Sequence, residues 1–177
     1  HAQERIGQYR AGAGRSALAQ INSEIVVGAL CERLADQRLQ ALIAEADVVL
    51  DCCDNFSTRY AINRACVRTG TPLVSGAAIR FSGQLSVFDP RRENAPCYHC
   101  LFPEGEDIEE TRCAIMGVFA PLTGIIGSMQ AAEALKLLSG AGSPAIGRLL
   151  LLDGLRMEWR SVNYQRDPQC AVCGTPP

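Results

Sequence analysis

The chain has 177 residues, the length of one ordinary domain. Hydrophobic residues make up 47% of it and charged residues 20%, a globular composition that excludes intrinsic disorder as the main state. With 17 basic and 19 acidic residues the net charge is −2, so there is no overall basic field to hold nucleic acid or an anionic membrane. We therefore expect neither a nucleic-acid partner nor a membrane partner.

The N-terminal part predicts helices that alternate with strands. We expect a helix over residues 11–22, a short strand over 25–30, a helix over 36–46 and a buried parallel strand over 47–51, which together make a β-α-β unit. Gly12 and Gly14 superficially match a dinucleotide-binding glycine loop. Polar residues precede them in place of an apolar strand, so we interpret them as two glycines tolerated in a helix.

The following segments extend the same pattern and then change it. A helix over 57–69 and a strand over 72–75 predict a mostly parallel, Rossmann-like sheet with helices on both faces. From residue 84 the pattern is that of antiparallel strands, at 84–88 and in a closing hairpin of 148–152 and 158–164 with a tight turn at Asp153-Gly154. We predict an α/β fold in a single domain over residues 1–177.

The longest apolar stretch, residues 118–138, has the length of a membrane span. It contains Pro121, Gln130, Glu133 and Lys136, so it predicts a buried helix of a soluble protein, ending at Ser139-Gly140. A short acidic loop is expected over 104–110.

The nine cysteines are unevenly placed, and four of them form two CxxC pairs. Because the total is odd, full disulfide pairing is disfavoured and a reducing, cytoplasmic compartment is expected. The pairs Cys97/Cys100 and Cys170/Cys173 have the spacing of zinc knuckles, so a closed, structural four-cysteine zinc site is the first interpretation. The alternatives are a redox pair or unrelated core thiols, although neither pair has a thioredoxin-like context.

Polar side chains follow the predicted buried strand at 47–51, where ligands bind in open parallel sheets. Asp54, next to Asn55, suits Mg²⁺ carried by nucleotide phosphates, and the alternative is that Asp54 caps the helix beginning near Ser57. Arg10, Arg59 and Asn63 are interpreted either as phosphate ligands or as solvated surface.

The remaining cysteines differ in their surroundings. Cys113 lies beside Arg112 and shortly before the long helix, two features that stabilise a thiolate, so it is the candidate reactive cysteine. The alternative is an incidental loop thiol. Cys52, Cys53 and Cys66 fall in apolar segments and are interpreted as packing residues.

Taken together, these segments resemble the ThiF/MoeB/HesA group of ubiquitin-activating-type enzymes over essentially the whole chain. The resemblance rests on motifs in the family's order: Asp47-Val-Val-Leu-Asp-Cys-Cys-Asp-Asn55, Thr58-Arg59, Pro72-Leu-Val-Ser-Gly-Ala-Ala78, Gly83-Gln84, Cys97-Tyr-His-Cys-Leu101, Gln130-Ala-Ala-Glu-Ala-Leu-Lys136 and Cys170-Ala-Val-Cys-Gly174.

The resemblance implies an adenylyltransferase that uses ATP and Mg²⁺ to adenylate the C-terminal glycine of a ubiquitin-like sulfur carrier, in thiamine or molybdenum cofactor biosynthesis. It implies that Asp54 holds the metal and triphosphate, with Asn55 and Arg59 beside it, and that the position of Arg10 contacts phosphate. It further implies zinc on the four paired cysteines, a covalent link between Cys113 and the carrier in some members, and a homodimer.

Two departures from the family pattern stand out. The family's opening strand and GxGGxG nucleotide loop are not among these residues, so we expect the chain to start just after them. Arg10 stands where the family has lysine, which retains charge with a different phosphate geometry. The alternative functions are a non-catalytic module that binds the carrier through a zinc-stapled scaffold and, less favoured, a zinc-bound redox protein.

Overall fold

The computed structural model describes residues 9–105 and 117–174 and divides the chain into two units, residues 1–35 and 36–177. In the first unit, α1 (Arg10–Ile21) contains both Gly12 and Gly14, which confirms the helical interpretation of these glycines. The strand predicted at 25–30 is wrong. No described strand pairs with this segment, so its backbone lacks ladder hydrogen bonds, and the side chain of Val26 is fully exposed.

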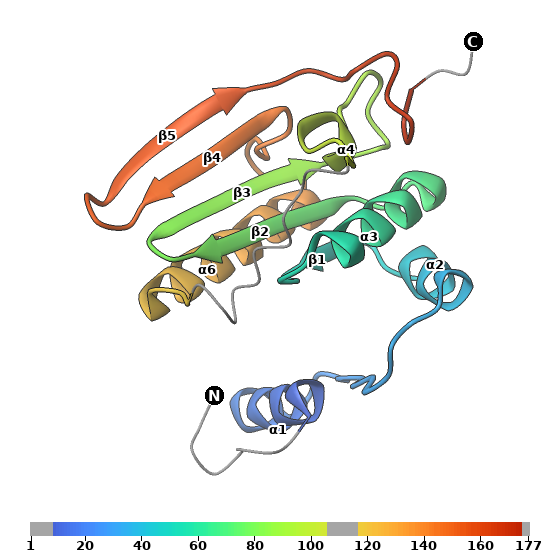
Figure 1. The fold of residues 1–177 in the computed structure, drawn as a ribbon. Helices are drawn as coiled ribbons and strands as arrows, with labels where there is room; N and C mark the ends of the chain where they lie inside the picture. Colours follow the sequence, from blue (N-terminus) through green and yellow to red (C-terminus); the bar gives the residue numbers. More distant parts are fainter. Residues whose placement is uncertain (1–8, 106–116, 175–177) are drawn as a thin grey trace. The chain divides into compact units, whose positions relative to one another are not determined.

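The second unit contains a five-stranded sheet in the order β1-β2-β3-β4-β5 (Figure 1). The pair β1–β2 is parallel, and the other three neighbouring pairs are antiparallel. The prediction that residues 1–177 form one domain stays a prediction. The elements, in chain order, are α2 (Asp36–Ala44), β1 (Val49–Asp51), α3 (Phe56–Thr69), β2 (Leu73–Ile79), β3 (Ser82–Phe88), α4 (Tyr98–Leu101), α6 (Ala120–Ser139), β4 (Arg148–Asp153) and β5 (Glu158–Asn163).

Helices cover both faces of this sheet, as the sequence predicts. Successive residues of β2 point to opposite faces of the sheet, so this strand contributes side chains to a core on each side. Leu73 packs with side chains of α2, α3 and α4 in one core cluster. Val74 packs with Ala134 of α6 in the other cluster, and α6 lies behind β2 and β3 in Figure 1. The α/β fold with antiparallel strands in its C-terminal half is thereby confirmed. The sheet is mixed and not mostly parallel, since only one of its four described strand pairs is parallel. The short connection between β2 and β3 makes this pair an antiparallel hairpin.

The cap of α3 differs from the predicted one. The side-chain oxygen of Asn55 accepts a hydrogen bond from the backbone N–H of Thr58 at 2.9 Å, so Asn55 is the N-cap, and the prediction that Asp54 caps this helix is wrong. The helix ends at Gly70, whose φ of 72° is the left-handed conformation that glycine adopts without strain. Because Asn55 is the N-cap, the carboxylate of Asp54 is not used to cap α3.

The hairpin of β4 and β5 is present, but its turn is longer than predicted. Asp153 pairs with Glu158, so the connection has four residues, 154–157, and the tight two-residue turn is wrong. The Asp153 carboxylate accepts hydrogen bonds from the backbone N–H groups of Leu155 and Arg156, which stabilise the wider loop.

The long helix α6 confirms the helix predicted for residues 118–138, and Gly140 terminates it with φ of 69°. The prediction that this helix is buried is correct for one face only, because Leu135 and Leu138 are more than half exposed. Within the described segments, no helix is long and apolar enough to cross a membrane. Gln130 attaches this helix to the sheet: its amide donates to the backbone oxygens of Asp51 at 2.8 Å and Val74 at 3.2 Å. A side chain at Gly76 would collide with Gln130, so glycine is needed there.

We expect Gln130→Ala to lower the free energy of unfolding by about 2–4 kcal/mol, because it leaves two buried carbonyl oxygens without these donors and opens a cavity. Denaturant unfolding followed by circular dichroism measures the change. Gln37→Ala, the same substitution on an exposed part of α2, is the control and should shift stability by less than about 0.5 kcal/mol. Equal effects of the two variants would contradict this account of Gln130.

Candidate functional site

The carboxyl end of β1 is held by a buried ion pair. The Asp51 side chain is 1% exposed and that of Arg59 is 6% exposed, and the two are joined by a 2.9 Å contact between Nη1 and Oδ2. The guanidinium of Arg59 also donates to the Ser75 hydroxyl at 3.0 Å and to the backbone oxygens of Gly76, at 3.0 Å, and Cys53. This network fixes the start of α3 to the ends of β1 and β2.

Beside this network lies a cavity of about 290 Å³ that brings together three of the predicted site residues, Asp54, Asn55 and Arg59. Asp54 is exposed, and its carboxylate accepts a hydrogen bond from the Asn55 amide at 3.4 Å. An accessible carboxylate at the edge of a cavity is a hard oxygen donor, which suits a hydrated divalent cation. The remaining lining residues are Cys53, Phe56, Ala77, Ala78, Ile79, Ser82, Gly83, Gln84, Tyr98, Phe102 and Leu151.

Two alternatives left open for polar residues of α3 are settled by burial. The surface interpretation of Arg59 is wrong, because its side chain lies inside the network described above. Both interpretations of Asn63 are wrong. Its side chain is 1% exposed, accepts the Tyr98 backbone N–H at 2.9 Å and donates to the Cys97 sulfur at 3.6 Å. Asn63 therefore supports the first CxxC pair.

The three cysteines interpreted as packing residues do not share one environment. Cys66 is 2% exposed in the core and confirms the interpretation, and burial raises the pKa of its thiol to about 12. Cys53 is partly buried against the same core, and burial likewise raises its thiol pKa to about 12. For Cys52 the interpretation is wrong, because the residue is exposed, with its sulfur 3.5 Å from the Gln130 side-chain oxygen.

The two CxxC pairs meet in space, as their spacing predicts. The four sulfurs of Cys97, Cys100, Cys170 and Cys173 all lie within 4.8 Å of one another, and all four are free thiols. Three of the sulfur separations are 3.9 Å for Cys97–Cys100, 3.7 Å for Cys97–Cys170 and 3.4 Å for Cys100–Cys173. Four sulfurs around zinc at about 2.3 Å stand about 3.8 Å apart, so this group fits a tetrahedral metal ion.

Hydrogen-bond donors surround this four-cysteine group. Besides Asn63, the backbone N–H of Val172 points to the Cys170 sulfur at 3.4 Å, and the His99 ring nitrogen Nδ1 lies 3.4 Å from the same sulfur. The Arg166 guanidinium donates to the Cys173 backbone oxygen. Such contacts orient metal ligands and stabilise the negative charge of thiolates.

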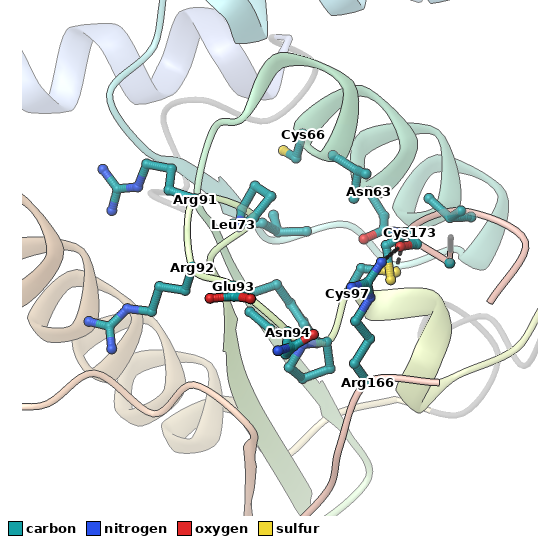
Figure 2. A pocket seen from close by; sticks show the side chains of 17 residues that line it. Asn63, Cys66, Leu73, Arg91, Arg92, Glu93, Asn94, Cys97, Arg166 and Cys173 are labelled. Atoms are coloured by element: carbon teal, nitrogen blue, oxygen red, sulfur yellow. Dashed lines mark hydrogen bonds between the residues drawn. The ribbon is translucent and has the colours of Figure 1, made fainter. Parts of the chain in front are cut away.

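A second and larger cavity, of about 580 Å³, lies beside the four-cysteine group (Figure 2). Figure 2 shows Arg166 extending toward Cys97 and Cys173, whereas Arg91 and Arg92 point away from them. Asp89 binds both of the latter, at 2.8 Å and 3.6 Å. Burial raises the pKa of Asp89, but the hydrogen bonds from Arg91 outweigh this and hold it below its ordinary value, so the carboxylate anchors the loop in its charged form.

Tyr98 is a site residue that the sequence analysis does not single out. Its side chain is 1% exposed and lines the cavity of Asp54, and burial raises the pKa of its hydroxyl to about 12. At neutral pH the hydroxyl therefore keeps its proton. Tyr98 directly follows Cys97, so the signal available in the sequence was its place inside the CxxC motif.

Two other predicted residues lie outside the described part of the second unit. Arg10 is the first residue of α1, in the first unit, and is exposed. Cys113 lies outside the described residues, as does most of the acidic loop predicted at 104–110. The roles of both residues stay predictions.

We expect Asn63→Leu to weaken metal binding by about 10- to 100-fold, because it removes the hydrogen bond to the Cys97 sulfur and the acceptor that fixes the Tyr98 backbone. Competition with a chromophoric zinc chelator measures the change. The control is Asn163→Leu in β5, which is exposed and should leave the affinity unchanged. Unchanged affinity in Asn63→Leu would show that Asn63 does not support the ligands.

Fold and site together define a class: an α/β domain with a polar cavity at the carboxyl end of its parallel strands and a four-cysteine group that joins two distant CxxC motifs. The model of the ThiF family matches residues 1–172, and the chain belongs to this family. The sequence resemblance to this group is thereby confirmed.

Relatives with high identity are adenylyltransferases by name. The chain is 44% identical over 175 residues to the molybdopterin-synthase adenylyltransferase of Salmonella typhimurium, covering 98% of this chain and 69% of that protein. It is 44% identical over 171 residues to the sulfur carrier protein ThiS adenylyltransferase of Escherichia coli, covering 97% and 67%.

Among solved structures, E. coli MccB crystallised with ATP has the same fold, with a TM-score of 0.80 at 22% identity. The match covers 99% of this chain and 54% of MccB, so the chain spans about half the length of that protein.

Proposed function

We propose that this chain carries out ATP-dependent adenylylation of the C-terminal glycine of a ubiquitin-like sulfur carrier. The observation that carries the proposal is the 44% identity, over nearly the whole chain, to two adenylyltransferases named for the molybdopterin and ThiS systems. The cavity that gathers Asp54, Asn55 and Arg59 supports it, because phosphoryl chemistry relies on positioning and on neutralising charge. Assays with each carrier in turn distinguish thiamine biosynthesis from molybdenum cofactor biosynthesis.

The proposed reaction is a nucleotidyl transfer. A carboxylate oxygen of the carrier's terminal glycine attacks the α-phosphorus of ATP, a new carboxyl O–P bond forms, and the bond to the β-phosphate breaks to release pyrophosphate. In our proposal Asp54 holds Mg²⁺, which neutralises charge on the phosphates. Asn55 keeps the Asp54 carboxylate in place through its amide while capping α3.

Arg59 contributes to this site chiefly as a positioning residue. Both of its terminal nitrogens are engaged by Asp51, Ser75 and backbone oxygens, so a phosphate would have to compete with these acceptors. By holding the end of β1 against the start of α3, Arg59 fixes the segment 52–55 that carries Asp54. Arg10 is proposed to contact phosphate, as the family resemblance implies.

The four-cysteine group is proposed to hold a structural zinc ion. All four ligands are supplied by the chain, which leaves no position for a catalytic water. The ion would join the start of α4 to the C-terminal segment 170–173, and its chemistry there is that of a cross-link.

Two further proposals concern the cellular compartment and the oligomeric state of the protein. The eight cysteines in the described segments are free thiols, which supports a reducing, cytoplasmic compartment. A homodimer is proposed from the family resemblance. It is supported by an apolar strip on α6 where Leu135 and Leu138 are 64% and 55% exposed.

Exchange of labelled pyrophosphate into ATP, dependent on the carrier, tests the proposed activity. We expect exchange by the natural protein and a loss of at least about a hundredfold in Asp54→Asn, because the amide removes the charge that holds the cation. The control is Asp47→Asn, which alters an exposed aspartate before β1 and should exchange normally. If the natural protein binds the carrier without exchange, the non-catalytic docking module is the correct function.

A further inference from the structure

The imidazole ring of His99 lies between the four-cysteine group and the chain that leaves α4. Its Nε2 accepts a hydrogen bond from the backbone N–H of Glu104 at 3.3 Å. Its Nδ1 lies 3.4 Å from the sulfur of Cys170. One ring therefore contacts both a proposed metal ligand and the backbone that follows the helix.

The contact with Glu104 determines which ring nitrogen of His99 carries the proton. A backbone N–H is always a donor, so Nε2 accepts through its lone pair, and the proton of the neutral ring is on Nδ1. In this tautomer Nδ1 donates to the sulfur of Cys170. A hydrogen bond of this kind stabilises the negative charge of a thiolate and fixes its orientation toward a metal ion.

The segment 102–104 connects His99 to the cavity of Asp54. Phe102 lines that cavity and packs against the core cluster formed by α2, α3 and α4. Two residues further along the chain, the backbone of Glu104 is bonded to His99. A displacement of the ring would therefore be transmitted over two residues to the wall of the cavity.

We propose that His99 is a positioning residue that couples the four-cysteine group to the wall of the Asp54 cavity, by donating from Nδ1 to the Cys170 thiolate and accepting the Glu104 N–H at Nε2. The inference rests on the metal site proposed above. His99 is not among the four ligands and does not line the cavity, so it acts through its two hydrogen-bond partners.

Two variants separate the two hydrogen bonds. An asparagine amide overlaps the position of histidine Nδ1, and a glutamine amide overlaps the position of histidine Nε2. His99→Asn therefore keeps a donor for Cys170 and loses the acceptor for Glu104. His99→Gln keeps the acceptor for Glu104 and loses the donor for Cys170.

The bond to the sulfur is tested with Co²⁺ in place of zinc, because the thiolate-to-cobalt absorption band responds to charge on the sulfurs. We expect His99→Gln to move this band to longer wavelength and to weaken zinc binding about tenfold or more, since the thiolate loses a donor. Competition with a chromophoric chelator measures the affinity. His99→Asn should have the natural spectrum.

The bond to the backbone is tested by hydrogen exchange at the Glu104 amide in the metal-loaded protein. We expect His99→Asn to speed this exchange about tenfold, and His99→Gln to leave it unchanged. In pyrophosphate exchange, His99→Asn should raise the KM for ATP several-fold with little change in kcat. A looser cavity wall weakens binding without removing a group that acts on the reacting atoms.

Tyr60→Phe is the matched control for the metal readouts. The Tyr60 hydroxyl donates to the backbone oxygen of Pro103 at 3.2 Å, so the substitution loosens the same segment 102–104 and leaves the bond between His99 and Cys170 in place. Its cobalt spectrum and zinc affinity should be those of the natural protein.

Three outcomes would overturn the inference. A natural spectrum and zinc affinity in His99→Gln would show that the ring does not donate to Cys170. Equal Glu104 exchange in the two His99 variants would show that Nε2 is not the acceptor. An unchanged KM in His99→Asn would remove the link to the cavity.

Two further results separate this inference from the proposals on which it is built. A natural protein that takes up no cobalt on its thiolates would refute the metal site and the inference together. A natural protein with both hydrogen bonds confirmed and no pyrophosphate exchange would refute the proposed adenylylation and, with it, the role of His99 in positioning the cavity wall for that reaction.

Discussion

Replacing Cys97 by serine is expected to abolish tight metal binding and to lower the free energy of unfolding by about 4 kcal/mol or more. Cys97 is 3% exposed and contributes one of four sulfurs within 4.8 Å of one another, in a group whose two halves are separated by 69 residues of chain. A structural zinc ion contributes its binding free energy to folding, so losing a ligand costs much of it. Denaturant unfolding and bound-zinc analysis measure the two effects.

Cys31→Ser is the control for this prediction, because Cys31 is exposed and stands outside the group. It should retain one zinc ion per chain and normal stability. Removal of metal from the natural protein with a chelator should lower stability as Cys97→Ser does. A chelated protein that unfolds at the same denaturant concentration as the untreated protein would contradict the structural role and leave the redox interpretation, which thiol titration would then examine.

Breaking the buried ion pair by Arg59→Met is expected to lower the free energy of unfolding by about 3–5 kcal/mol. The substitution leaves the carboxylate of Asp51, 1% exposed, without its cation, and an uncompensated buried charge is strongly destabilising. It also removes the donor shared by Ser75 and Gly76. We further expect the adenylylation rate to fall, since the segment that carries Asp54 loses its anchor.

Arg64→Met tests whether the effect is specific to the buried pair. Arg64 forms an ion pair of 3.0 Å with Glu104, but the two side chains are 38% and 53% exposed, so the loss should be below about 1 kcal/mol. The double variant Asp51→Asn with Arg59→Met should recover part of the stability, because no buried charge is then left alone. Equal losses in the two arginine variants would refute the account of this network.

Local signals in the sequence predicted much of this fold. The apolar run before Asp51, the glycine after α3 and the long apolar stretch that became α6 each carry their own periodicity or end signal, and all three elements are present. The strand predicted at 25–30 had the same kind of apolar run. A run alone does not supply a neighbouring strand, and none of the described strands pairs with it.

Part of the candidate site was also predictable. The two CxxC motifs predict a four-cysteine group, because two cysteines separated by two residues are a typical pair of zinc ligands. The position of Asp54 after a buried strand likewise anticipates the edge of a cavity.

The supporting residues were not predictable, because their roles depend on contacts between distant segments. Asn63 lies 34 residues from Cys97 and meets it only when α3 packs beside α4. In the sequence alone, Arg59 cannot be told apart from a surface or phosphate-binding arginine. Its acceptors, Asp51 of β1 and Gly76 of β2, are identified only by the folded structure.

Intact mass spectrometry of the carrier tests the central claim, that this chain forms an acyl adenylate at the cavity of Asp54, most directly. A ubiquitin-like sulfur carrier encoded by the same genome is incubated with ATP, Mg²⁺ and the natural protein, and its mass is measured before the adenylate hydrolyses. We predict that the carrier gains one adenylyl group with the natural protein and with Asp47→Asn, and none with Asp54→Asn. A carrier that binds the protein and never gains this mass would contradict the account.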